Sequence, residues 1–254
     1  MWRHIAQSLQ GPSHLQDNTP CQDAHAIRFV GDCAHPALVA CVADGAGSAK
    51  HSDVGSAIAC TAILEHATRF LETKEVRALQ AEDVLLWCDD VRDRLKLKSK
   101  EYLCGVRDLA TTLCAGILSA DFAAFFQIGD GAIVLGNDRL YGVVFWPQRG
   151  EYANSTNFLT ADEYHQQIQF LSTKGNFSKV ALMTDGLERL ALRFDTQTPH
   201  VPFFDPLFQA LQSTNDVNSL NEGLRGFLCS DPIHHRTDDD KTLVLAIQCT
   251  DDAA

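Results

Sequence analysis

The chain has 254 residues, of which 45% are hydrophobic and 21% charged, and its formal net charge is −12 at pH 7. This composition is typical of a globular protein that can bury a large core. The acidic balance argues against nucleic acid or an anionic membrane as a partner. No apolar stretch approaches the ~18 residues of a membrane span, and the first residues lack the apolar core of a signal peptide. These features together predict a cytoplasmic protein.

Nine cysteines occur, at positions 21, 33, 41, 60, 88, 104, 114, 229 and 249. Their number is odd and no two have C-x-x-C spacing, so neither a disulfide framework nor a zinc knuckle is expected. Free thiols are typical of a reducing compartment, which agrees with a cytoplasmic location.

The first half of the chain is expected to begin with strands and continue with two long helices. The strands are predicted near His4–Ser8, Ala24–Phe29 and Ala37–Ala43. The helices are predicted over Val54–Phe70, with Ser52 and Asp53 as candidate N-caps, and over Ala81–Leu103. Four strands in hairpin order follow near Thr111–Ser119, Phe122–Ile128, Ala132–Leu135 and Leu140–Val144, with turns at Asp121 and Asn137-Asp138.

The second half opens with a polar stretch over Pro147–Asn176, in which a helix is predicted over Ala161–Leu171. The remaining predictions are a strand over Lys179–Thr184, a helix near Leu187–Leu192, a loop rich in Pro and Phe, a helix over Val217–Cys229 and a last strand over Leu243–Ile247. No repeat or linker interrupts the chain, so one domain over residues 1–254 is expected. Strands, then a helix pair, then more strands predict an α+β fold.

Three apolar runs end in Asp-Gly. They read V-A-C-V-A-D-G at Val39–Gly45, F-F-Q-I-G-D-G at Phe125–Gly131 and V-A-L-M-T-D-G at Val180–Gly186. A further acidic cluster, Asp238–Asp240, precedes the last apolar run. Asp-Gly is ordinary turn chemistry, but carboxylates gathered at strand ends indicate a site for hard divalent cations. The pattern alone leaves metal-dependent hydrolases and a calcium-stabilised β protein open.

The order and flanks of these motifs resemble the metal-dependent protein phosphatases of type 2C, the PPM family. The resemblance runs from about Gly11 to Ile247 and is greatest to the compact bacterial members. The motifs that carry it are C-Q-D-A-H at Cys21–His25, V-A-D-G-A-G-S at Val42–Ser48, A-T-T-L at Ala110–Leu113, I-G-D-G at Ile128–Gly131, M-T-D-G-L at Met183–Leu187 and D-D-K-T at Asp239–Thr242.

The resemblance implies two packed, mostly antiparallel β-sheets flanked by helix pairs, with two Mn²⁺ or Mg²⁺ ions at one edge of the sandwich. It implies that Asp44 bridges the ions, with the carbonyl of Gly45, Asp185 and Asp239 as further ligands. Asp239 is chosen over its acidic neighbours because its spacing to Thr242 matches the family. The resemblance also implies that Asp23 orients a metal-bound water and that Asp130 supports a third ion or that water network.

The chain departs from the family pattern in its cations. The arginine that usually precedes the first acidic motif is missing, and His14 is a candidate to hold the substrate phosphate in its place, with a charge that depends on pH. A surface histidine without a role is the alternative. Lys50, Arg107 and Arg236 are the other candidates, and the sequence does not rank them.

Other departures concern proton transfer and metal affinity. Ala46 occupies the position where eukaryotic members often have a histidine as general acid, so His25, His51 or a metal-bound water is left to donate the proton. Gln22 stands where the family usually has an acidic residue before Asp23, which removes one negative charge from the surroundings of the metal ions and is expected to weaken their binding. The interval from Asp130 to Asp185 is shorter than usual, which predicts a reduced flap and a more open site. The segment Gly150–Asn154 within it is a plain loop or an edge of the site.

We therefore predict a monomeric serine/threonine protein phosphatase that acts on phosphoproteins, opposes a kinase, and uses a metal-bridging water without a phosphoenzyme. A pseudophosphatase that binds a phosphoprotein or partner without turnover is the alternative. The missing arginine and Ala46 favour that alternative, and the set Asp44, Asp130, Asp185 and Asp239 opposes it. A third class, a calcium-stabilised carbohydrate- or cell-surface β module, is disfavoured by the cysteine content and the missing signal peptide.

Overall fold

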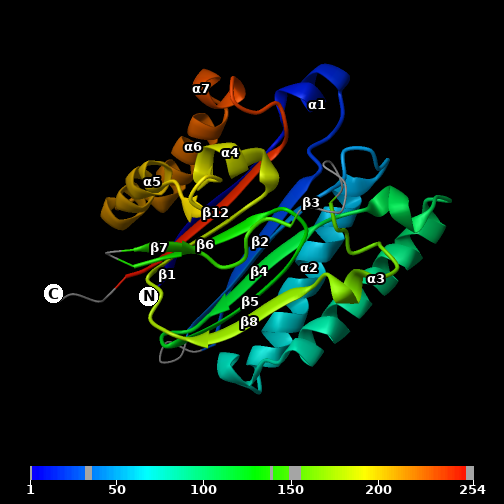
Figure 1. The fold of residues 1–254 in the computed structure, drawn as a ribbon, viewed down its shortest axis with the longest axis horizontal. Coiled ribbons are helices and arrows are strands. Elements are labelled where there is room, and N and C mark those ends of the chain that lie inside the picture. Colours follow the sequence, from blue (N-terminus) through cyan, green and yellow to red (C-terminus); the bar gives the residue numbers. More distant parts are fainter. Residues whose placement is uncertain (1, 32–35, 138–139, 149–155, 250–254) are drawn as a thin grey trace.

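The protein consists of two five-stranded antiparallel sheets that pack face to face between layers of helices (Figure 1). The structure, a computed structural model, describes residues 2–31, 36–137, 140–148 and 156–249. The first sheet has the order β1-β12-β9-β6-β7. Its strands are β1 (Trp2–Leu9), β12 (Lys241–Gln248), β9 (Lys179–Met183), β6 (Ala132–Gly136) and β7 (Tyr141–Val143). This arrangement confirms the predicted α+β fold.

The second sheet has the order β2-β3-β4-β5-β8. Its strands are β2 (Asp23–Val30), β3 (Ala37–Asp44), β4 (Leu113–Leu118), β5 (Phe122–Ile128) and β8 (Gln169–Lys174). A two-stranded ribbon, β10 (Leu192–Arg193) with β11 (Thr198–Pro199), lies apart from both sheets.

The helices cover the two outer faces of the sandwich. The helices α2 (Ser52–Leu71) and α3 (Ala81–Glu101) pack on the second sheet. The first sheet is covered by α4 (Glu188–Ala191), α5 (Val201–Ser213) and α6 (Val217–Leu228), beside which lies α7 (Asp231–His234). The short helix α1 (Pro12–Asp17) follows β1. The described residues also form four 3₁₀ turns: η1 (Val76–Ala78), η2 (Val106–Leu109), η3 (Tyr164–Gln166) and η4 (Asp185–Leu187).

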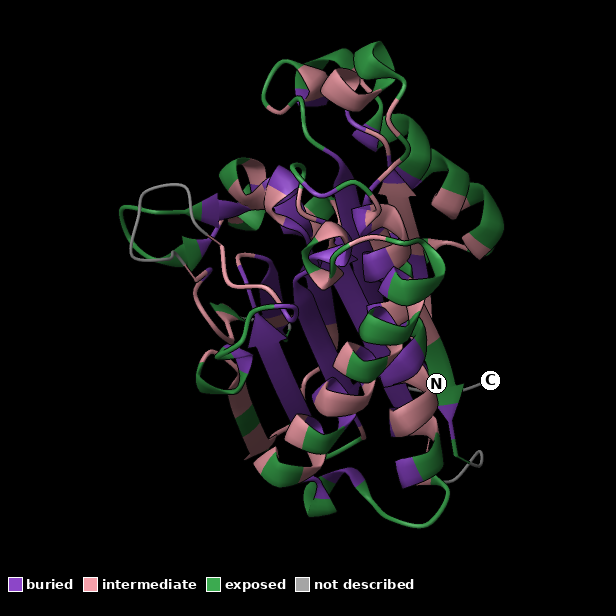
Figure 2. Ribbon diagram, turned by 90° about the vertical axis from the view of Figure 1, so that its right-hand side faces the viewer, coloured by how far each residue is buried: buried purple, intermediate pink, exposed green. Residues whose placement is uncertain are grey.

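Three apolar clusters hold these layers together, one between the sheets and one beneath each helix layer. Strand β3 contributes to two of them because alternate side chains of a strand point to opposite faces. Val39 and Cys41 pack beneath α2 and α3, while Leu38 and Val42 pack between the sheets. Figure 2 shows the consequence, with the central strands buried along their length and the long helices buried on one side only.

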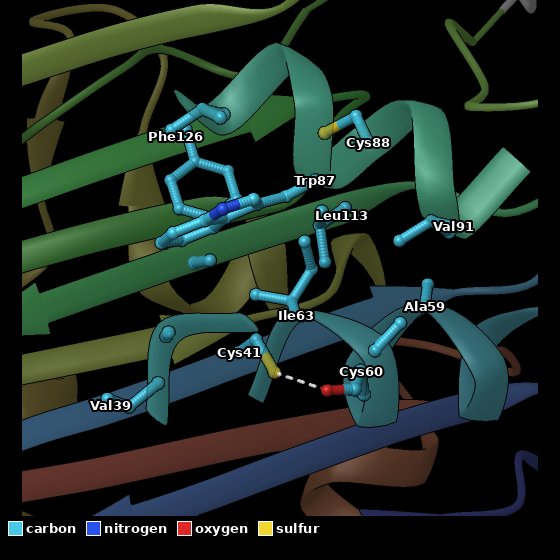
Figure 3. Close-up of a cluster of buried hydrophobic side chains, with 14 of the residues drawn as sticks. Val39, Cys41, Ala59, Cys60, Ile63, Trp87, Cys88, Val91, Leu113 and Phe126 are labelled. Carbon is cyan, nitrogen blue, oxygen red and sulfur yellow. Dashed lines mark hydrogen bonds between the residues drawn. The ribbon is translucent and has the colours of Figure 1, made fainter. Parts of the chain in front are cut away.

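The cysteines serve mainly as small core residues. Cys41 Sγ donates to the carbonyl oxygen of Cys60 at 3.4 Å beneath α2 (Figure 3). In the same cluster, Trp87 of α3 meets Phe126 of β5 edge to face, with the ring centroids 6.2 Å apart. Every cysteine in the described part of the chain is free, as the spacing predicted. Among the described helices, none has the length and apolar character needed to span a membrane.

Two predicted elements are wrong. The helix expected over Ala161–Leu171 is a single 3₁₀ turn followed by β8, which pairs with β5 so that Phe170 lies opposite Phe126. Pairing with the free edge of β5 satisfies backbone groups and overrides the local helical pattern. The loop expected to be rich in Pro and Phe contains α5. Pro202 lies in its first turn, where the amide needs no partner, and its buried side chains follow a helical period: Phe203, Phe204, Phe208 and Leu211.

Smaller differences concern element ends and undescribed residues. Helix α2 begins at Ser52, two residues before the prediction, with His51 as its N-cap. The strand predicted from Thr111 begins at Leu113, because Thr111 forms an isolated bridge with Gly45. Asp138 of one predicted turn and the segment Gly150–Asn154 lie outside the described residues.

Candidate metal centre

Asp44 occupies the end of β3, and its backbone is fixed from the neighbouring segment. Its amide donates to Thr112 Oγ1 at 2.9 Å, and its carbonyl oxygen accepts from Thr111 Oγ1 at 3.1 Å and from the Thr112 amide at 2.8 Å. A Cβ atom on Gly45 would lie 2.6 Å from the carbonyl oxygen of Ser52, so only glycine fits where the chain passes the start of α2. The two threonines therefore set the position of the carboxylate.

Three carboxylates converge beside this point. Oxygen atoms of Asp44, Asp130 and Asp185 all lie within 4.8 Å of one another. Asp130 lies in the turn between β5 and β6, directly after Gly129, whose φ of +103° few other residues adopt. Asp185 begins η4, with only Thr184 between it and the end of β9. The three Asp-Gly pairs thus bring carboxylates from both sheets to one edge of the sandwich.

These carboxylates open into a cavity of about 360 Å³. Its lining also includes Asp239, from the loop before β12, and a wall that no sequence motif had indicated, formed by Thr156 and Phe158. Thr156 Oγ1 donates to Asp130 Oδ2 at 2.6 Å, while Asp130 Oδ1 is buried and has no hydrogen-bond partner within the protein. One carboxylate oxygen is thus held and the other is left available to a ligand.

The cluster is electrostatically unfavourable on its own. Burial raises the pKa of Asp44 well above its ordinary value, and neighbouring carboxylates raise it further. Burial and the charges of Asp130 and Asp239 raise the pKa of Asp185 to about 7. Divalent cations would remove this repulsion. The unpartnered Asp130 oxygen, the convergent hard oxygen donors and the mutual repulsion all fit Mg²⁺ or Mn²⁺.

Asp23 lies next to the cluster without lining the cavity. It pairs with Asp44 across the β2–β3 ladder and is buried. Its Oδ2 accepts from Thr184 Oγ1 at 2.7 Å, and that hydroxyl oxygen accepts from the amide of Thr242 at 3.0 Å. Burial raises the pKa of Asp23, while these threonines lower it. The arrangement positions Asp23 behind the cluster and links both sheets.

The three aspartates before β12 lie in different environments. Asp239 faces the cavity, and its carbonyl oxygen accepts from Nζ of the buried Lys241 at 3.2 Å. Asp238 is exposed. Asp240 is buried and accepts from the amides of Gly11 and Gln22, each at 2.6 Å. Through these two hydrogen bonds, Asp240 holds the segment between β1 and β2 against the loop that precedes β12.

His14 contacts the same buried carboxylate, that of Asp240. It lies on α1 with Nδ1 2.9 Å from Asp240 Oδ1, and it is not among the residues that line the cavity. Within the described part of the chain, the cavity lining contains no Lys, Arg or His. Of the other candidate cations, Arg236 lines a separate groove, and neither Lys50 nor Arg107 lines the carboxylate cavity.

The two histidines considered as proton donors also have other neighbours. His25 Nδ1 lies 2.7 Å from Ser8 Oγ, and burial lowers the pKa of this histidine. His51 packs edge to face against Tyr102, with ring centroids 4.8 Å apart. Neither lines the cavity, and Ala46 does.

Comparison with known proteins gives one consistent result. A sequence model of the family described as protein phosphatase 2C matches residues 10–229. Serine/threonine-protein phosphatase 3 of Escherichia coli (strain K12) is 35% identical over 252 residues, which are 97% of this chain and 98% of that protein.

Solved structures share the fold at low sequence identity. A serine/threonine phosphatase from Staphylococcus aureus has a TM-score of 0.63 and 15% identity, with 98% of this chain and 96% of that chain covered. The catalytic domain of the serine/threonine phosphatase PstP, in complex with two manganese ions, has a TM-score of 0.59 and 14% identity, with 97% of each chain covered.

Proposed function

We propose, since this chain belongs to the protein phosphatase 2C family, that its carboxylate cluster is the metal centre of an active serine/threonine phosphatase. The substrates are phosphoserine and phosphothreonine side chains of proteins. The observation that carries the proposal is the approach of Asp44, Asp130 and Asp185 within 4.8 Å. A binding module without turnover would not need three mutually repelling, half-buried carboxylates at one point.

Asp44, Asp185 and Asp239, with the carbonyl of Gly45, would hold two Mn²⁺ or Mg²⁺ ions, and Asp130 would support a third position. When bound, such ions lower the pKa of water and stabilise charge on phosphoryl oxygens. Other residues of the chain position these carboxylates. Thr111 and Thr112 fix the Asp44 backbone, and further residues orient the cluster from behind or beside it: Asp23, Thr184 and Thr156.

The chain offers the phosphate dianion little positive charge of its own. The described lining of the cavity has four carboxylates and no cationic side chain. Substrate affinity is therefore expected to depend on the metal ions more strongly than in an enzyme with a phosphate-binding arginine. His14 Nδ1 faces Asp240, and the KM of a His14→Ala variant tests whether this histidine also holds the phosphate.

We further propose that the protein works as a single domain over residues 1–254 and as a monomer in the cytoplasm, opposing a protein kinase. The cytoplasmic location is supported by the free cysteines of the described residues and by the acidic net charge of the chain.

Turnover of p-nitrophenyl phosphate tests the central proposal. Activity is expected with Mn²⁺ or Mg²⁺, and none in excess EDTA. Asp44→Asn and Asp185→Asn should each abolish it. Asp238→Asn is the matched control, because this side chain is exposed and does not line the cavity. Wild-type turnover by Asp185→Asn, or full activity in EDTA, would refute the assignment, and a folded, metal-binding but inactive wild type would support the pseudophosphatase.

A further inference from the structure

A second and larger cavity lies outside the carboxylate cluster. It is a groove of about 990 Å³ between α4, α5, α6 and α7, on the outer face of the first sheet. Its volume falls in the range of about 300–1,000 Å³ that is typical of ligand sites. The floor is apolar, with Phe203, Leu224 and Ile233 buried in it, and Leu220 and Phe227 extend the apolar surface toward solvent.

The groove is positively charged in an otherwise acidic protein. Arg189, Arg193 and Arg236 line it, and its lining within the described residues contains no Asp or Glu, although the chain carries a formal charge of −12. Arg193 lies 3.6 Å from the exposed Asp195. Arg189 and Arg236 form no ion pair within the described part of the chain. Their charges are therefore available to an occupant.

Two arginines of the groove lie close in sequence to residues of the metal centre. Arg189 lies on α4, which follows Asp185 and η4 directly, and Arg236 lies three residues before Asp239. In Figure 1, α4 and α7 both lie toward the end of the sandwich at which β12 begins. A chain bound in the groove would therefore lie beside the cavity that receives the phosphate.

We propose that this groove docks an acidic segment of the phosphoprotein substrate, with an aliphatic or aromatic side chain on the apolar floor and carboxylates facing the arginines. The proposal rests on the proposed function, because it assigns a substrate class to the same site. The arginines come from three elements, α4, β10 and the turn after α7. Several carboxylates spaced along a peptide match that distribution better than the single charge of a small amphiphile.

Two glycines of α6 provide a matched pair of variants. A Cβ atom at Gly223 or at Gly226 would meet nothing within 4 Å, and both glycines are exposed, but only Gly223 lines the groove. Gly223→Trp should fill the groove, and Gly226→Trp should leave it open. Each change removes a glycine from a helix interior, which favours the helix, so both variants are expected to fold.

The probe is a fluorescent, unphosphorylated peptide of about twelve residues, roughly three helical turns, with leucines among glutamates. Fluorescence anisotropy should show saturable binding to wild type and to Gly226→Trp, with affinity at least about tenfold lower for Gly223→Trp. Arg189→Glu combined with Arg193→Glu should also weaken binding about tenfold, and a peptide with lysines in place of glutamates should not bind. Equal affinity of wild type and Gly223→Trp, or equal binding of the lysine peptide, would overturn the proposal.

A phosphothreonine version of the peptide separates docking from catalysis. Gly223→Trp should raise KM for it without changing kcat, while turnover of p-nitrophenyl phosphate stays at the wild-type rate in every groove variant. An unchanged KM would overturn the docking proposal. Absence of p-nitrophenyl phosphate turnover in wild type would instead contradict the proposed function, and peptide binding would still test the groove.

Discussion

Replacing Asp185 by asparagine is expected to stabilise the metal-free protein at neutral pH. Burial and nearby carboxylates raise the pKa of Asp185 from 3.8 to about 7. The folded state therefore holds this proton more tightly than the unfolded state. The resulting stability is fully present below about pH 3.8 and is lost as the pH rises to about 7. Asparagine does not ionise, so the variant avoids this loss.

The size of the effect follows from the same pKa. A rise from 3.8 to about 7 corresponds to about 4 kcal/mol, at about 1.4 kcal/mol for each tenfold change in the ionisation constant. Solvent in the open cavity screens the charges, so we expect a gain of roughly 2–4 kcal/mol for Asp185→Asn above pH ~7.5. In saturating Mn²⁺ the wild type should instead be more stable than Asp185→Asn, because only the wild type keeps the full set of metal ligands.

Urea unfolding in excess EDTA, followed by tryptophan fluorescence from about pH 5 to about pH 8, measures this difference. The advantage of Asp185→Asn over wild type should grow with pH. Asp238→Asn, the exposed control, should follow wild type throughout. An advantage that is absent at every pH, or that shrinks as pH rises, would refute the reasoning.

Three further results are expected. Gly186→Ala should cost about 1–3 kcal/mol in urea unfolding, because its Cβ would lie 1.9 Å from the Asp240 carbonyl oxygen, whereas Gly142→Ala meets nothing within 4 Å and should be neutral. Thr184→Val should cost about 1–3 kcal/mol, because a buried carboxylate and a buried amide lose their shared hydroxyl. Thr184→Ser should restore the wild-type midpoint. His14→Ala should lower stability and leave KM for p-nitrophenyl phosphate unchanged if this histidine braces Asp240, whereas a raised KM at constant kcat would assign it to the phosphate.

The sequence predicted where strands end better than it predicted which side chains come together at those ends. Apolar runs followed by Asp-Gly located Asp44 and Asp185 at the ends of β3 and β9, because a buried strand and its turn leave a local pattern. The pattern indicated a cation site, but which carboxylates meet there came from the family resemblance, since period and spacing do not specify packing between sheets. The role of Asp240 as an acceptor of two backbone amides has no local pattern either.

The features that the sequence analysis missed depend on single polar residues and on tertiary pairing. Thr156 contacts Asp130 from a loop without a motif, so nothing in its neighbours distinguishes it. Strand β8 exists because β5 offers a free edge, and α5 forms despite Pro202 and Pro206 because its aromatic stripe is buried. In each case a partner remote in sequence outweighs the local preference.

The pairing of β1 with β12 has a consequence for synthesis of the protein. All eight residues of Trp2–Leu9 pair with Lys241–Gln248, so β1 must wait for β12, which is made more than 230 residues later, to complete its ladder. Asp239 also enters the chain only just before β12. A nascent chain is thus expected to leave the ribosome with an open sheet edge and an incomplete cation site, exposed to chaperones. Phosphate release should begin only after residue 248 has emerged, which a series of ribosome-stalled chains can time.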